Sequence, residues 1–441
     1  MAASDAVRSR MVTGPSVALP GELHPASAAP LPASRQHKLL GPLHEPLFRH
    51  LWIAAVVSYI GTWMQNLGAG WMMASLTMSP LMVGLVQAAN SIAVFLVVLP
   101  AGAIADVVDR RKLLLLTQLW MVIAAAALGV LAIAGLVTPA LLLLFTFLMG
   151  FGAVLNDPAW QAITPEVVSR ENFAGSIALN SAGFNAARAI GPALGGLVIY
   201  AAGSGVAFLL NAVSFFGVIL FLYRWKRPPG RTFVRPSHMF ETMFDGFRQL
   251  GSSRTVHCVL VRSAVFSISA SALLALLPLY SHCFGSLGFG ALLALFGVGS
   301  LAGAALLPWL RRMMSVDALV ASSTAVFAVA TFAAGRWPSF LALSFTLPIA
   351  GIAWIQILAS LNVAAQTMSP HCMRARAISM YLLVLQGGFA LGAALWGAVA
   401  ERVGIEQSMK YASIALLLGI IATIWFRLRP VPVEPNLIGM D

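Results

Sequence analysis

The sequence is short of charge. Only 10% of its 441 residues are Asp, Glu, Lys or Arg, whereas 59% are apolar and the mean hydropathy is +0.86. A soluble globular domain carries roughly 25% charged residues. This scarcity excludes a protein that is dissolved in bulk water, and it indicates a chain that lies mostly in a lipid bilayer.

Cysteine pairs, histidine motifs and phosphate-binding loops are also missing. The three cysteines, Cys258, Cys283 and Cys372, lie far apart without a CxxC pair, which argues against a disulfide framework and a zinc site. The absence of HExxH and of GxxxxGK[ST] argues against a metalloprotease and against an ATP-driven pump. The apolar runs hold neither a carboxylate pair nor a histidine cluster, so an embedded enzyme is not favoured. We expect no metal and no cofactor.

The chain does contain many long apolar runs. A helix of about 20 apolar residues crosses a bilayer. The runs predict an all-α integral membrane protein with twelve transmembrane helices. The predicted spans are 51–74, 80–104, 113–135, 139–163, 172–202, 205–225, 256–281, 288–310, 315–335, 338–367, 376–400 and 408–427.

The first 45 residues differ from the rest. The stretch "SVALPGELHPASAAPLPAS" is rich in Ala, Pro and Ser and has no periodicity, which predicts a disordered tail. It does not read as a secretory signal, because no apolar segment follows its early arginines. A weak similarity to an organelle transit peptide is the alternative.

Basic residues outnumber acidic ones, and their placement explains why. If the N-terminus is cytoplasmic, 22 of the 27 Lys and Arg residues fall on the inner side; Arg336, Arg402 and Lys410 fall outside, and Arg188 and Arg262 fall within spans. Cytoplasmic loops of membrane proteins are enriched in this way. The net charge of +12 therefore reflects topology rather than nucleic-acid binding, and both termini are expected in the cytoplasm.

Two short stretches recur in the second half of the chain. "GAIADVVDRR" at 102–111 matches "GAALLPWLRR" at 303–312, and "QAITP" at 161–165 matches "QTMSP" at 366–370. The nearly equal shifts predict two six-helix bundles, a known transporter architecture with a substrate site between the halves. The expected segments are a cytoplasmic tail (1–45), an N-terminal bundle (46–225), a linker (226–254), a C-terminal bundle (255–429) and a second cytoplasmic tail (430–441).

These motifs resemble those of the major facilitator superfamily of secondary transporters. "GAIADVVDRR" resembles its 2–3 loop signature, with Asp109 at a usual Gly, and "ARAIGPALGG" (187–196) resembles the antiporter motif of its exporters. "GTWMQNLGAGWMMASLTMSPLMVGLV" (61–86), "NDPAWQAITPEVV" (156–168) and "SIALNSAGFNAARAIGPALGG" (176–196) resemble a bacterial subfamily of putative efflux proteins and enterobactin exporters. The resemblance covers residues 45–428.

The resemblance implies a conformational latch at the cytoplasmic side. Asp106 would face the start of the eleventh helix, where a partial positive charge favours an anion and Arg374 or Arg376 would add attraction. Arg110 would reach Asp157 or Glu166, and Arg111 belongs to the same motif. A contact made in one conformation biases the equilibrium between two states. The alternative is that these bases only mark topology.

The fifth predicted helix carries Gly191, Pro192, Gly195 and Gly196. Small residues allow close helix packing in membranes. The resemblance adds a directional role, in which a kink closes the path and favours export.

Asp157 and Arg188 are the deepest ionisable residues of the predicted bundles. At 1.5 Å rise per residue, Asp157 lies about 13 Å from the level of Glu166, and Arg188 about 25 Å from that of Glu171. Their depths differ by about 10 Å, which disfavours a direct pair. Charges inside the membrane are functional candidates, with a structural partner role as the alternative.

Further polar groups lie at mid-span depth, and either a cavity or interhelical hydrogen bonds account for them. Trp63, Met64, Trp71 and Trp354 would give an apolar wall. The polar candidates are Gln65, Asn66, Asn90, Asn185, Gln356 and Gln386.

The central linker contains "HMFETMFDGFRQL" (238–250), whose apolar residues fall on one helical face. This pattern predicts a helix on the inner membrane surface or under the two bundles.

The sequence therefore predicts a secondary transporter in a bacterial inner membrane. We expect a monomer that exports an amphipathic small molecule, either a drug-like compound or a siderophore, by alternating access and in exchange for protons. The alternatives are uptake by the same fold and, less favoured, a non-transporting scaffold or sensor. The proton coupling is implied by the resemblance alone.

Overall fold

The structure is a computed structural model that describes residues 40–225, 254–367 and 374–428. The side chains of residues 99, 102, 103, 105–107, 254, 255, 374 and 375 are not described. The predicted tail up to residue 39, the linker helix at 238–250 and the tail at 430–441 therefore lie outside the described residues, as do the side chains of Asp106 and Arg374.

The regular elements of the described residues are helical. The N-terminal group comprises η1 (Gly41–His44), α1 (Pro46–Leu76), α2 (Pro80–Val107), α3 (Arg110–Ile133), α4 (Pro139–Val167) and α5 (Phe173–Arg224). The C-terminal group comprises α7 (Arg254–Tyr280), η3 (His282–Phe284), α8 (Gly285–Met313), α9 (Val316–Arg336), α10 (Phe340–Thr367), α11 (Arg374–Val403) and α12 (Ile405–Ala422).

Local chemistry explains where several helices begin. Pro46, Pro80 and Pro139 occupy the first helical turn, where the amide that proline lacks has no partner in any case. Ser79 caps α2 by accepting a hydrogen bond from the amide of Met82. These signals fix the helix starts close to the predicted ones.

The predicted boundary between spans 172–202 and 205–225 falls at a kink. α5 runs from Phe173 to Arg224 as two helical arms on either side of one non-helical residue, Gly203, at φ 83° and ψ 165°. A positive φ of this kind suits glycine because it has no Cβ to clash. The two predicted spans are thus joined by a bend at a single residue.

Ten helices of the described part are long and apolar enough to cross a membrane. α5 counts once among them although it holds two predicted spans, and α1 is not among them. The polar side chains of Gln65 and Asn66 interrupt the apolar run of α1. The prediction of an all-helical, multi-pass membrane protein is confirmed at this level.

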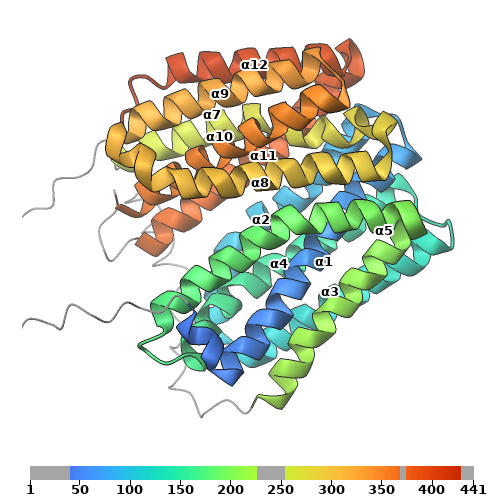
Figure 1. The fold of residues 1–441 in the computed structure, drawn as a ribbon, viewed down its shortest axis with the longest axis vertical. Coiled ribbons are helices and arrows are strands. Elements are labelled where there is room, and N and C mark those ends of the chain that lie inside the picture. The colour runs from blue at the N-terminus through green and yellow to red at the C-terminus, as the bar shows by residue number, and fades with distance from the viewer. Residues whose placement is uncertain (1–39, 226–253, 368–373, 429–441) are drawn as a thin grey trace, which may run out of the picture. The chain divides into compact units, whose positions relative to one another are not determined.

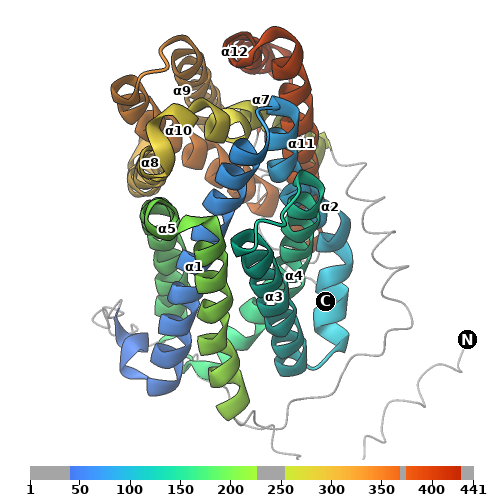
Figure 2. The same cartoon turned by 90° about the vertical axis from the view of Figure 1, so that its right-hand side faces the viewer.

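The same packing pattern occurs in both groups (Figures 1 and 2). In the N-terminal group α1 packs on α5, while α2 and α3 both pack on α4; in the C-terminal group α7 packs on α11, while α8 and α9 both pack on α10. The two groups meet chiefly where α2 packs on α11 and α5 packs on α8.

Candidate functional site

Arg110 at the start of α3 pairs with an acid near the end of α4. Its Nη1 lies 3.0 Å from Glu166 Oε1 and donates a second hydrogen bond to the carbonyl of Ala162 at 3.3 Å. Of the two acids that the sequence offered, the geometry places Glu166, not Asp157, against this arginine. We call this side of the molecule the Arg110 end.

The neighbours of Arg110 bind backbone groups. Arg111 donates to the carbonyls of Leu222 (2.7 Å) and Tyr223 (2.8 Å), where α5 ends. A cation at the last carbonyls of a helix also offsets its dipole. Asp109, which replaces the usual glycine of the motif, caps α3 by accepting a hydrogen bond from the amide of Lys112 at 2.9 Å.

The repeat in the C-terminal group keeps the arginine but not the acid. Arg311 donates to the carbonyl of Ala359 on α10 at 3.2 Å, as Arg110 does to Ala162 on α4. Among the described residues Arg311 has no acidic partner, and its buried Nε forms no hydrogen bond there. The two groups therefore share a backbone contact, and of these two arginines only Arg110 also forms an ion pair within the described residues.

At the opposite side of the molecule, Glu401 joins α11 to the start of α2. Its Oε2 accepts a hydrogen bond from Ser79 Oγ at 2.7 Å and another from the amide of Leu81 at 3.2 Å. Helix N-termini favour such anions. We call this side the Glu401 end. Sequence reasoning missed this contact; the available signal was an acid after a predicted span.

The motif of Gly191, Gly195 and Gly196 lies where three helices converge. A Cβ added to Gly191 would lie 2.5 Å from Trp63 Cβ, and one added to Gly195 would lie 3.1 Å from Met64 Cα, both on α1. A Cβ on Gly196 would lie 2.6 Å from the carbonyl oxygen of Ser286 on α8. These glycines allow α5 to approach both groups at once.

Pro192 takes part in the same contact through its carbonyl. A Cβ added to Gly290 of α8 would lie 2.6 Å from that oxygen, and Ser286 Oγ donates to the carbonyl of Gly196 at 3.3 Å. α5 remains helical through Pro192. The observed role of this motif is close packing between the two groups.

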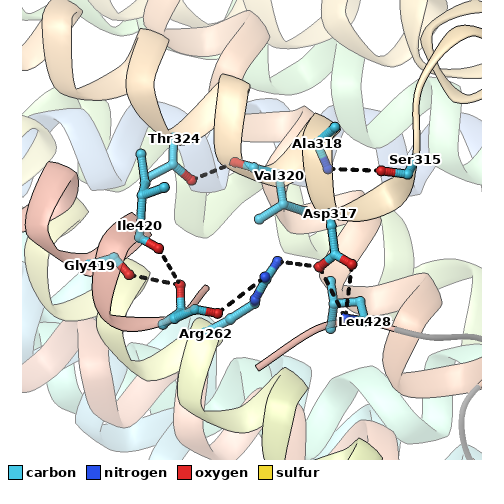
Figure 3. Close-up of polar contacts among 10 residues, drawn as sticks. Arg262, Ser315, Asp317, Ala318, Val320, Thr324, Gly419, Ile420 and Leu428 are labelled. Atoms are coloured by element: carbon cyan, nitrogen blue, oxygen red, sulfur yellow. Dashed lines mark hydrogen bonds and ion pairs between the residues drawn. The ribbon is translucent and has the colours of Figure 1, made fainter. Parts of the chain in front are cut away.

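Of the two arginines within predicted spans, Arg262 is paired. Figure 3 shows it reaching from α7 toward Asp317 near the start of α9, and the two form an ion pair at 2.8 Å. Arg262 also donates to the carbonyl of Thr423 at 3.3 Å, while Asp317 accepts hydrogen bonds from the amide of Leu428. This network ties α7 and α9 to the end of α12.

A cavity of about 420 Å³ adjoins this ion pair, between α7, α9 and α12. It lies within the C-terminal group, and its lining includes none of the residues that the sequence proposed for transport. We therefore assign the Arg262 cluster to helix packing.

Arg188, the other intramembrane arginine, lies against aromatic rings instead of an acid. Its guanidinium carbon is 5.4 Å from the centre of the Trp63 ring on α1 and 5.7 Å from that of Phe296 on α8. It forms no hydrogen bond or ion pair with any residue that the structure describes.

Asp157 lies on an exposed face of α4, together with Gln161. The helix that carries both residues, α4, packs against α1 as well as against α2 and α3. Arg376, on α11, is partly exposed.

Several of the polar cavity candidates are used for packing. Gln65 is 5% exposed and accepts a hydrogen bond from Asn211 at 2.5 Å, and Gln356 is 1% exposed and donates to the carbonyl of Gly303. Asn185 donates to the carbonyl of Ser181 in its own helix. Gln65 and Gln356 therefore form interhelical hydrogen bonds, and both are too buried to line an open cavity.

The remaining candidates differ in exposure. Asn66 is exposed, Gln386 is partly exposed, and Asn90 faces α4 at Gly150. Of the expected apolar wall, Trp63 is partly exposed and contacts Arg188, whereas Met64 and Trp354 are buried. Trp354 stacks on Phe389 at 5.1 Å within an aromatic cluster, and Trp71 stacks on His282.

Comparison with known proteins gives a consistent family. A family model described as transmembrane secretion effector matches residues 38–437. The chain is 26% identical over 381 residues to the enterobactin exporter of Escherichia coli O1:K1, which covers 85% of this chain and 90% of that protein. It is 24% identical over 173 residues to the staphyloferrin A transporter of Staphylococcus aureus (strain NCTC 8325 / PS 47), which covers 39% of this chain and 44% of that protein.

Solved structures with the same fold are also transporters. A bacterial homologue of the human lysosomal transporter Spinster, in an inward-facing and unoccupied conformation, has a TM-score of 0.71 at 16% identity and covers 89% of this chain and 100% of its own. A mutant of the nucleoside transporter NupG has a TM-score of 0.67 at 14% identity, covering 86% and 99%. At these identities the similarity establishes the fold.

Proposed function

Because this chain belongs to the transmembrane secretion effector family of the major facilitator superfamily, and is thus a multi-pass transporter, we propose that it exports an amphipathic small molecule. The substrate is a siderophore or a drug-like compound. Transport proceeds by alternating access in a monomer, in exchange for protons. The named activity of the enterobactin exporter, aligned over 90% of its length, supports this direction of transport.

The proposal includes twelve spans in two six-helix bundles, over residues 46–225 and 255–429. The equivalent packing of α1–α5 and α7–α12 supports this repeat. α5 supplies two spans on either side of Gly203, and α1 supplies one more beyond the ten apolar helices. The segments 1–45, 226–254 and 430–441 are then cytoplasmic.

The charge distribution orients the two ends in the inner membrane. With most basic residues in the cytoplasm, the Arg110 end is inner and the Glu401 end is outer. The contacts of Glu401 with α2 and of Gly196 with α8 close the space between the groups on the outer side. In this orientation, these contacts support a conformation that is closed to the outside, as in an inward-facing transporter.

The observation that carries the proposal is the presence of two ionisable side chains within predicted spans, Asp157 and Arg188, neither with an ion-pair partner among the described residues. Charges inside a membrane are costly and mark substrate or proton pathways. A carboxylic acid can take up and release a proton, so we assign the proton to Asp157. Arg110, Arg111 and Glu166 form the inner latch with Asp106, Arg374 and Arg376.

Secretion measurements test the direction of transport. Overexpression of the full chain is expected to raise, and deletion of its gene to lower, the extracellular amount of a siderophore or toxic amphiphile. Unchanged extracellular amounts for every candidate would argue against export, and increased accumulation inside the cell would indicate uptake.

Proteoliposomes with an imposed pH gradient test the coupling. Asp157→Asn is expected to abolish gradient-driven flux while leaving substrate exchange, whereas Asp157→Glu, which keeps a titratable group, is expected to retain part of the flux. Unaltered flux in Asp157→Asn would remove Asp157 from the proton pathway.

A further inference from the structure

Arg188 and Arg262 both lie within predicted membrane spans, but their side chains have different partners. Both are within membrane-spanning helices, where an uncompensated charge is costly. Arg262 has the Asp317 carboxylate at 2.8 Å and the carbonyl of Thr423 at 3.3 Å (Figure 3). Arg188 has neither kind of partner among the described residues. Contacts between packed helices therefore compensate the charge of Arg262, whereas the charge of Arg188 is not compensated by any described residue.

Aromatic rings hold the Arg188 guanidinium in position. It lies over Trp63 of the N-terminal group at 5.4 Å and over Phe296 of the C-terminal group at 5.7 Å. Cation–π contacts are weaker than a buried ion pair, so they orient the cation without neutralising it. A contact with a ring occupies no hydrogen-bond acceptor, and the Arg188 N–H groups donate to none of the described residues, so these donors are available to another partner.

The partner that fits such a group is a planar anion. A guanidinium donates two parallel hydrogen bonds to a carboxylate, and its aromatic neighbours favour an apolar or aromatic body beside the negative group. We propose that Arg188 is the anion-recognition residue of the transport site, and that the exported molecule carries a carboxylate attached to an apolar body. This inference rests on the proposed function.

The position of Arg188 links recognition to the conformational change. Next to it, a Cβ on Gly297 of α8 would lie 2.8 Å from Ala189 Cα and from the Arg188 carbonyl oxygen, so α5 and α8 touch at this level. An anion at Arg188 is thus bounded by residues of both groups. When α8 moves against α5, the surroundings of the bound anion change, while the anion remains bound to Arg188 on α5.

Binding to the purified full-length protein tests the inference. The probes are 2-naphthoate and its methyl ester, which share one aromatic body and differ in charge. Wild type is expected to bind the anion more tightly than the ester. Arg188→Met is expected to weaken binding of the anion by about 10- to 100-fold, the usual loss for a hydrogen-bonded ionic contact, and to leave the ester unchanged.

Arg188→Lys keeps the charge but loses the planar donor pair, so an intermediate loss is expected. This variant also provides the test if Arg188→Met does not fold. Equal anion and ester binding by wild type, or an unchanged anion-to-ester ratio in both folded variants, would overturn the inference.

Export assays separate this inference from the proposed function. If wild-type cells export a compound and the Arg188 variants show the same anion preference, only the assignment of Arg188 fails. If wild-type cells export nothing, the proposed function fails.

Discussion

At the scale of single residues, the charged side chains divide by what they contact. Arg110 meets an acid and a carbonyl, Arg111 meets two carbonyls, and Arg262 meets both kinds of group. Each holds the end of one helix against another. Arg188 and Asp157 have no such contact among the described residues, which is why they are the candidates for transport.

Glu45, which precedes α1, gives a prediction of pH dependence. Its carboxylate accepts hydrogen bonds from Asn172 Nδ2 (2.6 Å) and from Ser169 Oγ (2.7 Å) and the Ser169 amide. Partial burial acts to raise the pKa of Glu45, but these hydrogen bonds outweigh it and lower the pKa below its usual value. The folded state therefore favours the charged form.

The stabilisation from Glu45 is expected to be complete above the pKa of the unfolded chain and to disappear as the pH falls through the lower folded pKa. Glu45→Ala should lower stability by about 1 kcal/mol at neutral pH, because the donors face partial solvent. Melting temperatures in detergent at pH 7 and at pH 3–4 check this. A difference from wild type that is equally large in acid would contradict it.

Sequence reasoning proposed candidate residues but could not give the direction in which each one points. Counting along a helix predicts depth, and on that basis it placed Asp157 and Arg188 at different levels. It does not give rotation about the helix axis relative to a neighbour, so Gln65 and Asn66 were indistinguishable although one is buried against Asn211 and the other is exposed. Rotation is set by packing between helices distant in sequence.

At the scale of helices, the Glu401 end holds α2 and α11 together. In the proposed orientation, Glu401 and the start of α2 are the outer counterpart of the contact proposed between Asp106 and the start of α11. Glu401→Gln is expected to weaken the outer contact and raise the population of the outward-open state.

A buried reporter measures this shift. Ala393 is 0% exposed and packs with Ala88 and Ala275, so Ala393→Cys in a background without native cysteines is protected while the outer end is closed. Glu401→Gln should increase its labelling rate several-fold. Glu406→Gln is the control, because Glu406 lies at the same end and has no described hydrogen bond to α2. Equal labelling rates of Ala393→Cys in the Glu401→Gln and Glu406→Gln variants would exclude a latch at Glu401.

Close packing of α5 gives another prediction. Gly196→Ala would place a methyl group 2.6 Å from the Ser286 carbonyl oxygen, so α5 and α8 must separate or α5 must shift. We expect a loss on the order of 1–3 kcal/mol, as for overpacked cores. The matched control on the same helix is Gly217→Ala, where the nearest atom, Ala54 Cβ, is 3.5 Å away.

Thermal stability of the two purified variants distinguishes them. Gly217→Ala should melt close to wild type and Gly196→Ala several degrees lower. Similar melting temperatures would show that the α5–α8 contact adapts to a methyl group.

Helix positions were well predicted because apolar runs, prolines and capping residues act locally. Spans such as 139–163 and 338–367 fall within a few residues of α4 (Pro139–Val167) and α10 (Phe340–Thr367). The boundary predicted at 202–205 matches the kink at Gly203, where a glycine between two apolar runs permits a positive φ. The contact of Glu401 with α2 was missed because it spans 322 residues.

At the scale of the whole molecule, the proposed alternating-access mechanism implies that contacts at the two ends compete. In a two-state equilibrium, weakening one end raises the population in which that end is open. The equivalent packing of the two groups would make this transition a movement of one group against the other.

Paired variants test this balance. Asp106→Asn, chosen from the sequence motif, is expected to open the inner end and lower Ala393→Cys labelling, whereas Glu401→Gln raises it. If the two effects are independent, the double variant should label at nearly the wild-type rate. Identical labelling of Asp106→Asn and wild type would remove Asp106 from the latch.

The bend at Gly203 has a practical consequence for biochemistry on this protein. A single residue, Gly203, joins the two arms of α5. This connection therefore lacks the extended backbone that a protease binds, and an inserted epitope tag would disrupt the helices on both sides. Limited digestion of intact vesicles should leave it uncut, and affinity tags are better placed at the chain termini.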